Sequence, residues 1–153
     1  MATEPAMAAS DGRSMRAVLS GVVGGVIGGI IGGLLIQFGF DPQILSEDLP
    51  RTFGITGLGA GWVVMVLYGL VIGLVYAGIA IVPQLRGYAV RPNTGAGLGL
   101  AYGLLVWAIY AVAMSAIIGV QSVGAYPLTT GSVLTFGLVG LIIGIVYGMS
   151  PYT

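Results

Sequence analysis

Glycine recurs at every fourth position in the apolar stretch from Ser20 to Phe38. On a helix, residues four apart share one face, so the stretch carries two neighbouring glycine rows. The rows are Gly21, Gly25, Gly29 and Gly33, and Gly24, Gly28 and Gly32. In water each glycine would weaken a helix by about 1 kcal/mol relative to alanine. In lipid the helix forms anyway, because an unpaired backbone group costs more. The stretch therefore predicts a transmembrane helix built for close packing.

Composition supports a membrane protein. The 153 residues are 57% hydrophobic and 7% charged, and the formal net charge is zero. A soluble domain carries about 25% charged residues, so this chain has too little polar surface to stay in water. Its class is therefore predicted to be an integral membrane protein, with the lipid bilayer as its surroundings.

Several kinds of chemistry are excluded by residue types that the sequence lacks. It contains no cysteine, histidine or lysine. Without cysteine there is no disulfide or thiolate site, and without histidine the commonest ligand for zinc, copper or haem is missing. A neutral chain also offers no basic patch for nucleic acid. We expect no metal site, no cofactor and no nucleic-acid partner.

Hydropathy predicts one transmembrane domain over residues 16–153, preceded by a disordered cytoplasmic tail over residues 1–15. The four expected spans are about 17–38, 61–82, 96–120 and 131–149. Residues 83–95 are expected to form an extramembrane loop and residues 121–130 a turn.

The connection over residues 39–60 has two interpretations, which the sequence leaves open. Asp41 and Pro42 suit an N-cap and a first helical position. Ile44, Leu45 and Leu49 would then line one side of a short helix at the membrane interface. The alternative is a plain loop.

The arginines predict an orientation. An even number of spans puts both termini and the 83–95 loop on one side. That side holds four of the five arginines, which are Arg13, Arg16, Arg86 and Arg91, and the other side holds Arg51. Arginine-rich sides face the cytoplasm. We therefore expect a multi-pass protein of the cell membrane with both termini cytoplasmic.

The sequence repeats itself at an offset of 71 residues. Residues 69–76 read GLVIGLVY and residues 140–147 read GLIIGIVY, and the same offset relates a glycine row of the first span to one of the third. Two tandem hairpins, about 14–82 and 85–153, would be related by an axis along the membrane normal. The predicted fold is all-α, a four-helix membrane bundle built from two parallel repeats.

Helix packing is the role expected of the repeated glycines. They are Gly24, Gly28, Gly32, Gly95, Gly99, Gly103, Gly69, Gly73, Gly140 and Gly144. We expect the first two rows, Gly24/28/32 and Gly95/99/103, to meet near the symmetry axis. The remaining row, Gly21/25/29/33, packs either inside the chain or outward against another subunit.

Polar chemistry is sparse in the spans. None of them contains Asp, Glu, Lys, Arg or His, the residues that mark proton relays, ion sites and acid–base catalysis. We expect no enzyme activity. Tyr76 and Tyr147 lie at equivalent depths and are candidates for an interhelical hydrogen bond. Ser115 is expected to bond within its own helix, and Gln37 and Gln121 to be solvated or bonded to loop backbone.

The motifs resemble one family. They are GWVV at Gly61, GLVY ending at Tyr76, GAGLGLAYGLLVW from Gly95 to Trp107, and GIVYG in the last span. This pattern resembles small, glycine-rich four-helix membrane proteins of unassigned function from archaea, especially halophiles. The resemblance implies the four-helix fold and no catalytic residues.

Two functions remain open from the sequence. The first is a structural or accessory role through glycine-mediated packing, alone or in a larger membrane complex. The second is a passive channel or small-solute pore formed by several copies, which requires a polar stripe or a hydrophobic gate along its axis.

Overall fold

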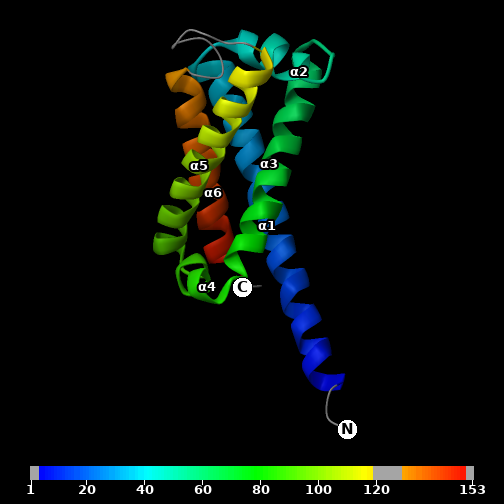
Figure 1. Cartoon of the computed structure of the whole chain (residues 1–153), viewed down its shortest axis with the longest axis vertical. Helices are drawn as coiled ribbons and strands as arrows, with labels where there is room; N and C mark the ends of the chain where they lie inside the picture. Colours follow the sequence, from blue (N-terminus) through cyan, green and yellow to red (C-terminus); the bar gives the residue numbers. More distant parts are fainter. Residues whose placement is uncertain (1–3, 119–128, 151–153) are drawn as a thin grey trace.

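The protein is an up-and-down bundle of four long helices (Figure 1). The computed structural model describes residues 4–118 and 129–150, with side chains for 14–116 and 129–150. The long helices are α1 (Glu4–Gly39), α3 (Leu58–Ala80), α5 (Pro92–Ile118) and α6 (Thr130–Met149). Each contains a stretch long and apolar enough to cross a membrane. The predicted all-α, four-span fold is confirmed.

The candidate spans follow the predicted ones closely. They are Ser14–Gly39, Leu58–Ala80, Pro92–Ala116 and Thr130–Met149. The largest shift is in α5, which begins at Pro92 because proline suits the first position of a helix. The predicted turn over 121–130 lies almost wholly outside the described residues.

The N-terminal segment differs from the expected disordered tail, because α1 already begins at Glu4. Three alanines, Ala6, Ala8 and Ala9, favour the helix there. The span behind them has already formed the helix nucleus, so extension needs no new one. In Figure 1 this part of α1 projects beyond the rest of the bundle.

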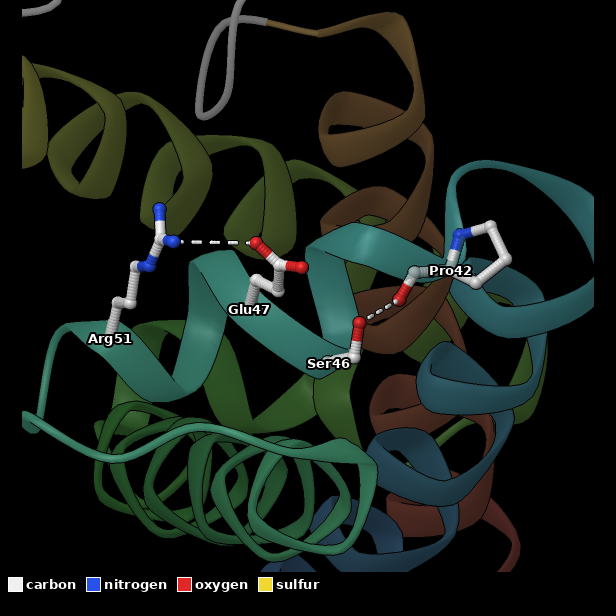
Figure 2. Close-up of polar contacts among 4 residues, drawn as sticks. All are labelled: Pro42, Ser46, Glu47 and Arg51. Carbon is white, nitrogen blue, oxygen red and sulfur yellow. Dashed lines mark hydrogen bonds and ion pairs between the residues drawn. The ribbon is translucent and has the colours of Figure 1, made fainter.

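The 39–60 connection contains a helical segment over residues 44–51, so the plain-loop alternative is wrong. A π-helix, η1 (Ile44–Asp48), leads directly into α2 (Leu49–Arg51). Asp41 caps the start, since its Oδ1 accepts a 2.9 Å hydrogen bond from Gln43 N. Figure 2 shows two further bonds: Ser46 Oγ donates to Pro42 O at 3.2 Å, and Arg51 pairs with Glu47 at 3.3 Å.

The predicted apolar side of this segment is buried. Ile44, Leu45 and Leu49 are all under 7% exposed. They pack against the end of the bundle and not into lipid; Gly61 of α3 lies so close to Leu45 O that a Cβ would overlap it. We call this end of the bundle the η1 end.

The 83–95 segment also contains a helix where a loop was expected. α4 (Pro83–Ala89) starts at a proline after an extended Val82. It lies at the opposite end of the bundle, with the N-terminal half of α1, the start of α5 and the end of α6 (Figure 1). We call this the α4 end.

Helix neighbours define two hairpins joined along one side. α1 packs closely on α3, and α5 packs closely on α6. The hairpins meet mainly through α1 and α6, whereas α3 and α5 barely touch. Among the described residues, α1 and α5 are not neighbours. The core between the helices is filled by Tyr76, Ile143 and Val139, each at most 2% exposed.

Candidate functional site: glycine seams and buried tyrosines

The first seam joins α1 to α3 through glycine on both helices. Cβ atoms placed on Gly21 and Gly25 would overlap the carbonyl oxygens of Gly73 and Gly69. A Cβ on Gly29 would lie 2.9 Å from Met65 O, closer than side chains pack. Backbone therefore meets backbone along this seam, which only residues without a side chain permit.

The second seam joins α5 to α6 in the same way. A Cβ on Gly95 would lie 2.7 Å from Gly144 O, and one on Gly99 would overlap Gly140 O. A Cβ on Gly103 would overlap Phe136 O. Each hairpin thus has the same three-step contact pattern.

This correspondence changes the predicted equivalence of the glycine rows. In contacts, Gly95, Gly99 and Gly103 match Gly21, Gly25 and Gly29, a shift of 74 residues. The second helices keep the shift of 71, from Gly69 to Gly140. The prediction that Gly24/28/32 correspond to Gly95/99/103 is wrong. The chain from a glycine of the first helix to its contact on the second helix is three residues longer in the first hairpin than in the second. A repeat described by one offset of 71 residues cannot include that difference.

The row Gly24/28/32 forms a third seam, between α1 and α6. A Cβ on Gly24 would lie 3.3 Å from Ile143 Cα, and one on Gly28 would lie 3.2 Å from Val139 O. The predicted meeting with Gly95/99/103 is wrong, since that row faces α6 from the other side. The row Gly21/25/29/33 faces α3, so it does not point outward; its last member rests on the Trp62 ring.

In the second hairpin, α5 has large residues at the positions where α1 has the glycines of the third seam. A shift of 74 takes Gly24, Gly28 and Gly32 to Leu98, Tyr102 and Val106 of α5. Their side chains hold α5 away from α3, so the seam between these helices is filled by side chains instead of backbone contact. The two helices of each hairpin therefore pack in the same way, but the contact between α1 and α6 differs from the contact between α3 and α5.

Three tyrosines meet in the middle of the bundle. The ring of Tyr76 lies 5.5 Å from those of both Tyr102 and Tyr147, centroid to centroid, and the contact with Tyr147 is T-shaped. Tyr76 Oη donates a 3.3 Å hydrogen bond to Gly95 O, across from α3 to α5. Tyr147, the other predicted candidate, contributes its ring to Tyr76.

Tyr102 also belongs to this cluster, although the sequence pattern did not indicate a hydrogen bond from it. It is 8% exposed, and its Oη donates a 2.9 Å hydrogen bond to Ile72 O on α3. Together with the bond from Tyr76, α3 and α5 thus each donate one tyrosine hydrogen bond to the backbone of the other helix. The sequence carried no signal for this role, because the offset of 71 pairs Tyr102 with Ile31, and only the contacts pair it with Gly28.

Two tryptophans, one in each hairpin, tie paired helices together toward the η1 end. Trp62 Nε1 donates to Gln37 Oε1 at 2.9 Å, joining α3 to α1. Trp107 Nε1 donates to Ser132 Oγ at 3.1 Å, joining α5 to α6. Gln37 was expected to be solvated or bonded to loop backbone, which is wrong. Gln121 lies outside the described residues.

Two serines have opposite environments. Ser20 is 2% exposed, and its Oγ lies 2.7 Å from Ser150 Oγ, which links α1 to the end of α6. Ser115 Oγ is buried and has no hydrogen-bond partner among the described residues, so the predicted bond within its own helix is wrong. An unpaired hydroxyl is unfavourable in an apolar setting.

Charged side chains of the η1 end surround Asp48. Its pKa is raised above the ordinary value, chiefly by burial and further by the carboxylates of Asp41 and Glu47, while Arg51 opposes the shift. Within residues 4–118 and 129–150, no group of three or more acidic, histidine or cysteine residues is placed to hold a metal.

Comparison of the chain with protein-family models, with curated proteins and with solved structures finds no match. The class of this protein is therefore assigned from its fold alone. Four apolar helices joined by glycine seams define a multi-pass membrane protein.

Proposed function

We propose that this protein is a structural or accessory component of a membrane, acting through rigid helix packing and not through catalysis. The observation that carries the proposal is the use of glycine. Two seams bring backbone against backbone within the hairpins, at Gly25 and Gly69 and at Gly99 and Gly140, and a third sets Gly28 against the backbone oxygen and the side chain of Val139. Such contacts make a compact, rigid unit, because a helix that lacks side chains on one face fits closely against its neighbour.

The absence of ionisable residues supports a role without chemistry. From Ala17 to Gly39, and throughout α3, α5 and α6, the sequence has no acidic or basic side chain. Acid–base catalysis and ion-coupled transport both depend on such groups. We infer that the protein is neither an enzyme nor a coupled carrier.

The pore alternative has less support. A pore through one copy would need a polar path, yet Tyr76 and Ile143 are fully buried at the centre of the bundle. A pore between copies would need an outward seam, and the row available for that, Gly21/25/29/33, packs on α3 and Trp62. The accessory role is therefore the better proposal.

We further propose the orientation given by the arginines. Arg16, Arg86 and Arg91 belong to segments that meet at the α4 end, whereas Arg51 lies at the η1 end. If the arginine-rich end is cytoplasmic, both termini face the cytoplasm of a cell membrane.

A partner would contact the bilayer-facing sides of the helices. α5 is the least buried of the four candidate spans, and Leu105, Ile109 and Val112 on it are more than half exposed. A larger membrane complex or a second copy fits such a surface.

The test is purification of the tagged protein from its native membranes in mild detergent, followed by measurement of the mass of the intact particle. The proposal predicts a stable complex with larger subunits, and no solute flux from liposomes that contain the protein alone. A ring of identical copies with solute flux would establish the pore instead. A lone monomer in every mild detergent would contradict the accessory role.

A further inference from the structure

Positive charge collects at the α4 end of the bundle, although the formal net charge of the chain is zero. From Ser14 onward, the acidic residues all lie in the 39–60 connection at the η1 end. The other acids precede Ser14, in the part of α1 that projects beyond the bundle (Figure 1). Within residues 14–116 and 129–150, the one ion pair joins Arg51 to Glu47 at the η1 end. The arginines of the α4 end therefore have no ion-pair partner in that part of the chain.

Two of these arginines flank the last turn of α6, and both have exposed side chains. The backbone of Arg91 packs on this turn, because a Cβ on Gly148 would lie 2.8 Å from the carbonyl carbon of Arg91. On α1, Ser20 Oγ donates to Arg16 O at 3.0 Å and lies 2.7 Å from Ser150 Oγ. Residues four apart share a helix face, so Arg16 lies on the side of α1 that faces the end of α6.

The short helix α4 carries a third arginine, Arg86, to the level where a bilayer has its headgroups. One candidate span ends at Ala80 and the next begins at Pro92, so α4 lies just outside the apolar part of the bundle. Ala89 on its inner side is fully buried, whereas Arg86 and Tyr88 are exposed. An exposed tyrosine in a helix between two spans is typical of the membrane interface.

Tyr147 on α6 offers a hydroxyl without a partner beside this arginine. The residue is 3% exposed, and Arg86 lies near enough for its positive charge to act on the hydroxyl. Tyr76 Oη and Tyr102 Oη donate to backbone carbonyls, but Tyr147 Oη makes no hydrogen bond within residues 14–116 and 129–150. A hydroxyl without a partner is unfavourable away from water, so a ligand oxygen that accepts its proton would be favourable there.

This hydroxyl is still accessible to a ligand. Among the described residues, the only fully buried side-chain oxygen without a partner belongs to Ser115, so Tyr147 Oη keeps some access to the surface. The neighbouring guanidinium favours a negatively charged oxygen there. Phosphate fits best, because a guanidinium can pair with two phosphate oxygens at once while a third accepts the tyrosine proton.

We propose that the α4 end binds the phosphate group of an anionic membrane lipid, held by Arg86 and the hydroxyl of Tyr147. Arg16 and Arg91 add attraction for the negative headgroup. The position of α4 between two spans favours a lipid over free phosphate as the source of this group. The inference stands on these residues and does not depend on the accessory role.

The test is native mass spectrometry of the full-length protein with dioleoyl phosphatidylglycerol or dioleoyl phosphatidylcholine. We expect retained phosphatidylglycerol and much less phosphatidylcholine, because the choline cation is repelled by the arginines. Arg86→Gln should lower phosphatidylglycerol retention about fivefold, which corresponds to the roughly 1 kcal/mol that one arginine contributes at a membrane surface. Arg51→Gln makes the same change of charge at the η1 end and should leave retention unchanged. Equal retention of the two lipids, or equal loss in the two variants, would overturn the proposal.

Tyr147→Phe distinguishes a specific site from general attraction of anionic lipid to a basic surface. The variant keeps the ring contact with Tyr76 and removes only the hydroxyl. It should lower retention about tenfold, or about 1.4 kcal/mol, close to the lower limit for a hydrogen bond to a charged group. Tyr102→Phe removes a hydroxyl that is already bonded within the bundle and should leave retention unchanged. Equal retention by these two variants would overturn the proposal.

Inorganic phosphate without lipid is the probe for the other source of the same chemistry. It lacks the hydrocarbon chains that keep a lipid beside the bundle, so we expect no phosphate adduct and no displacement of phosphatidylglycerol. An adduct of inorganic phosphate that is lost in Arg86→Gln would overturn the assignment to a membrane lipid.

Discussion

Tyr102 of α5 donates a 2.9 Å hydrogen bond to the backbone carbonyl of Ile72 on α3, across the one side of the bundle that glycine does not close. The equivalent position of the first hairpin is Gly28, which lets α1 and α6 touch. α1 and α6 thus come close because Gly28 has no side chain, whereas α3 and α5 are joined by the large polar side chain of Tyr102. This difference leaves α3 and α5 apart.

The tyrosine bond gives the first prediction. Tyr102→Phe keeps the ring but removes the hydroxyl, so the free energy of unfolding in detergent should fall by about 0.5–1.5 kcal/mol. Tyr88→Phe is the matched control, because Tyr88 is 60% exposed, and should change little. Equal stability of both variants would mean that the bond contributes nothing.

The glycine seams give the second prediction. Gly25→Ala places a methyl group against Gly69 O and should destabilise the bundle by about 1–3 kcal/mol. Gly97→Ala changes the same residue type on α5, where a Cβ would meet nothing within 4 Å. That variant should be neutral or more stable by up to about 1 kcal/mol, because alanine is the better helix former. A denaturant titration of both variants measures the contrast, and identical shifts would count against the seam.

A double-mutant cycle tests the bond between Trp62 and Gln37. Trp62→Phe, Gln37→Leu and the double variant should show a coupling free energy of about 1 kcal/mol, since either single change leaves the other polar group unpaired. The measurement is the free energy of unfolding of all four proteins. Strict additivity would mean that the two side chains act independently.

Asp48 gives a prediction about pH. Its folded-state pKa is raised, chiefly by burial, so the folded protein holds this proton more tightly than the unfolded chain. The stabilising contribution is therefore complete below the ordinary value of 3.8 and is lost as pH rises through the folded-state pKa. Asp48→Asn removes this dependence. Relative to the wild type, the variant should gain stability as pH rises through that range, and an unchanged difference across it would contradict the assignment.

Much of the fold could be predicted from the sequence because a helix in lipid must meet simple physical requirements. Each span must be a helix about 20 residues long, so apolar length alone places all four. Glycines four apart likewise indicate close helix contacts. At the η1 end, the spacing of Ile44, Leu45 and Leu49 indicated the apolar side of a candidate helix but did not decide between that helix and a loop.

The features that could not be predicted from the sequence depend on which residues of neighbouring helices lie opposite one another. Glycine identity at one offset related Gly28 to Gly99, whereas the contacts relate Gly25 to Gly99, because the two hairpins differ by three residues between matched contacts. Tyr102 was not among the predicted hydrogen-bonding residues, since a pattern does not say which carbonyl a hydroxyl will reach.

The most direct test of the account is disulfide trapping between α1 and α6, in a chain that has no natural cysteine. A Cβ on Gly24 would lie 3.5 Å from Val146 Cβ, within the range of about 3.5–4.5 Å that a disulfide needs. The comparison pair is Gly24→Cys with Leu98→Cys, which joins α1 to α5.

Intact mass after oxidation and alkylation reports each bond. Because the Gly24/28/32 row packs on α6, we expect an intramolecular disulfide for Gly24→Cys with Val146→Cys and none for Gly24→Cys with Leu98→Cys. A disulfide in the second pair, or one in the first pair that forms only between two chains, would contradict the packing of the Gly24/28/32 row inside a single bundle.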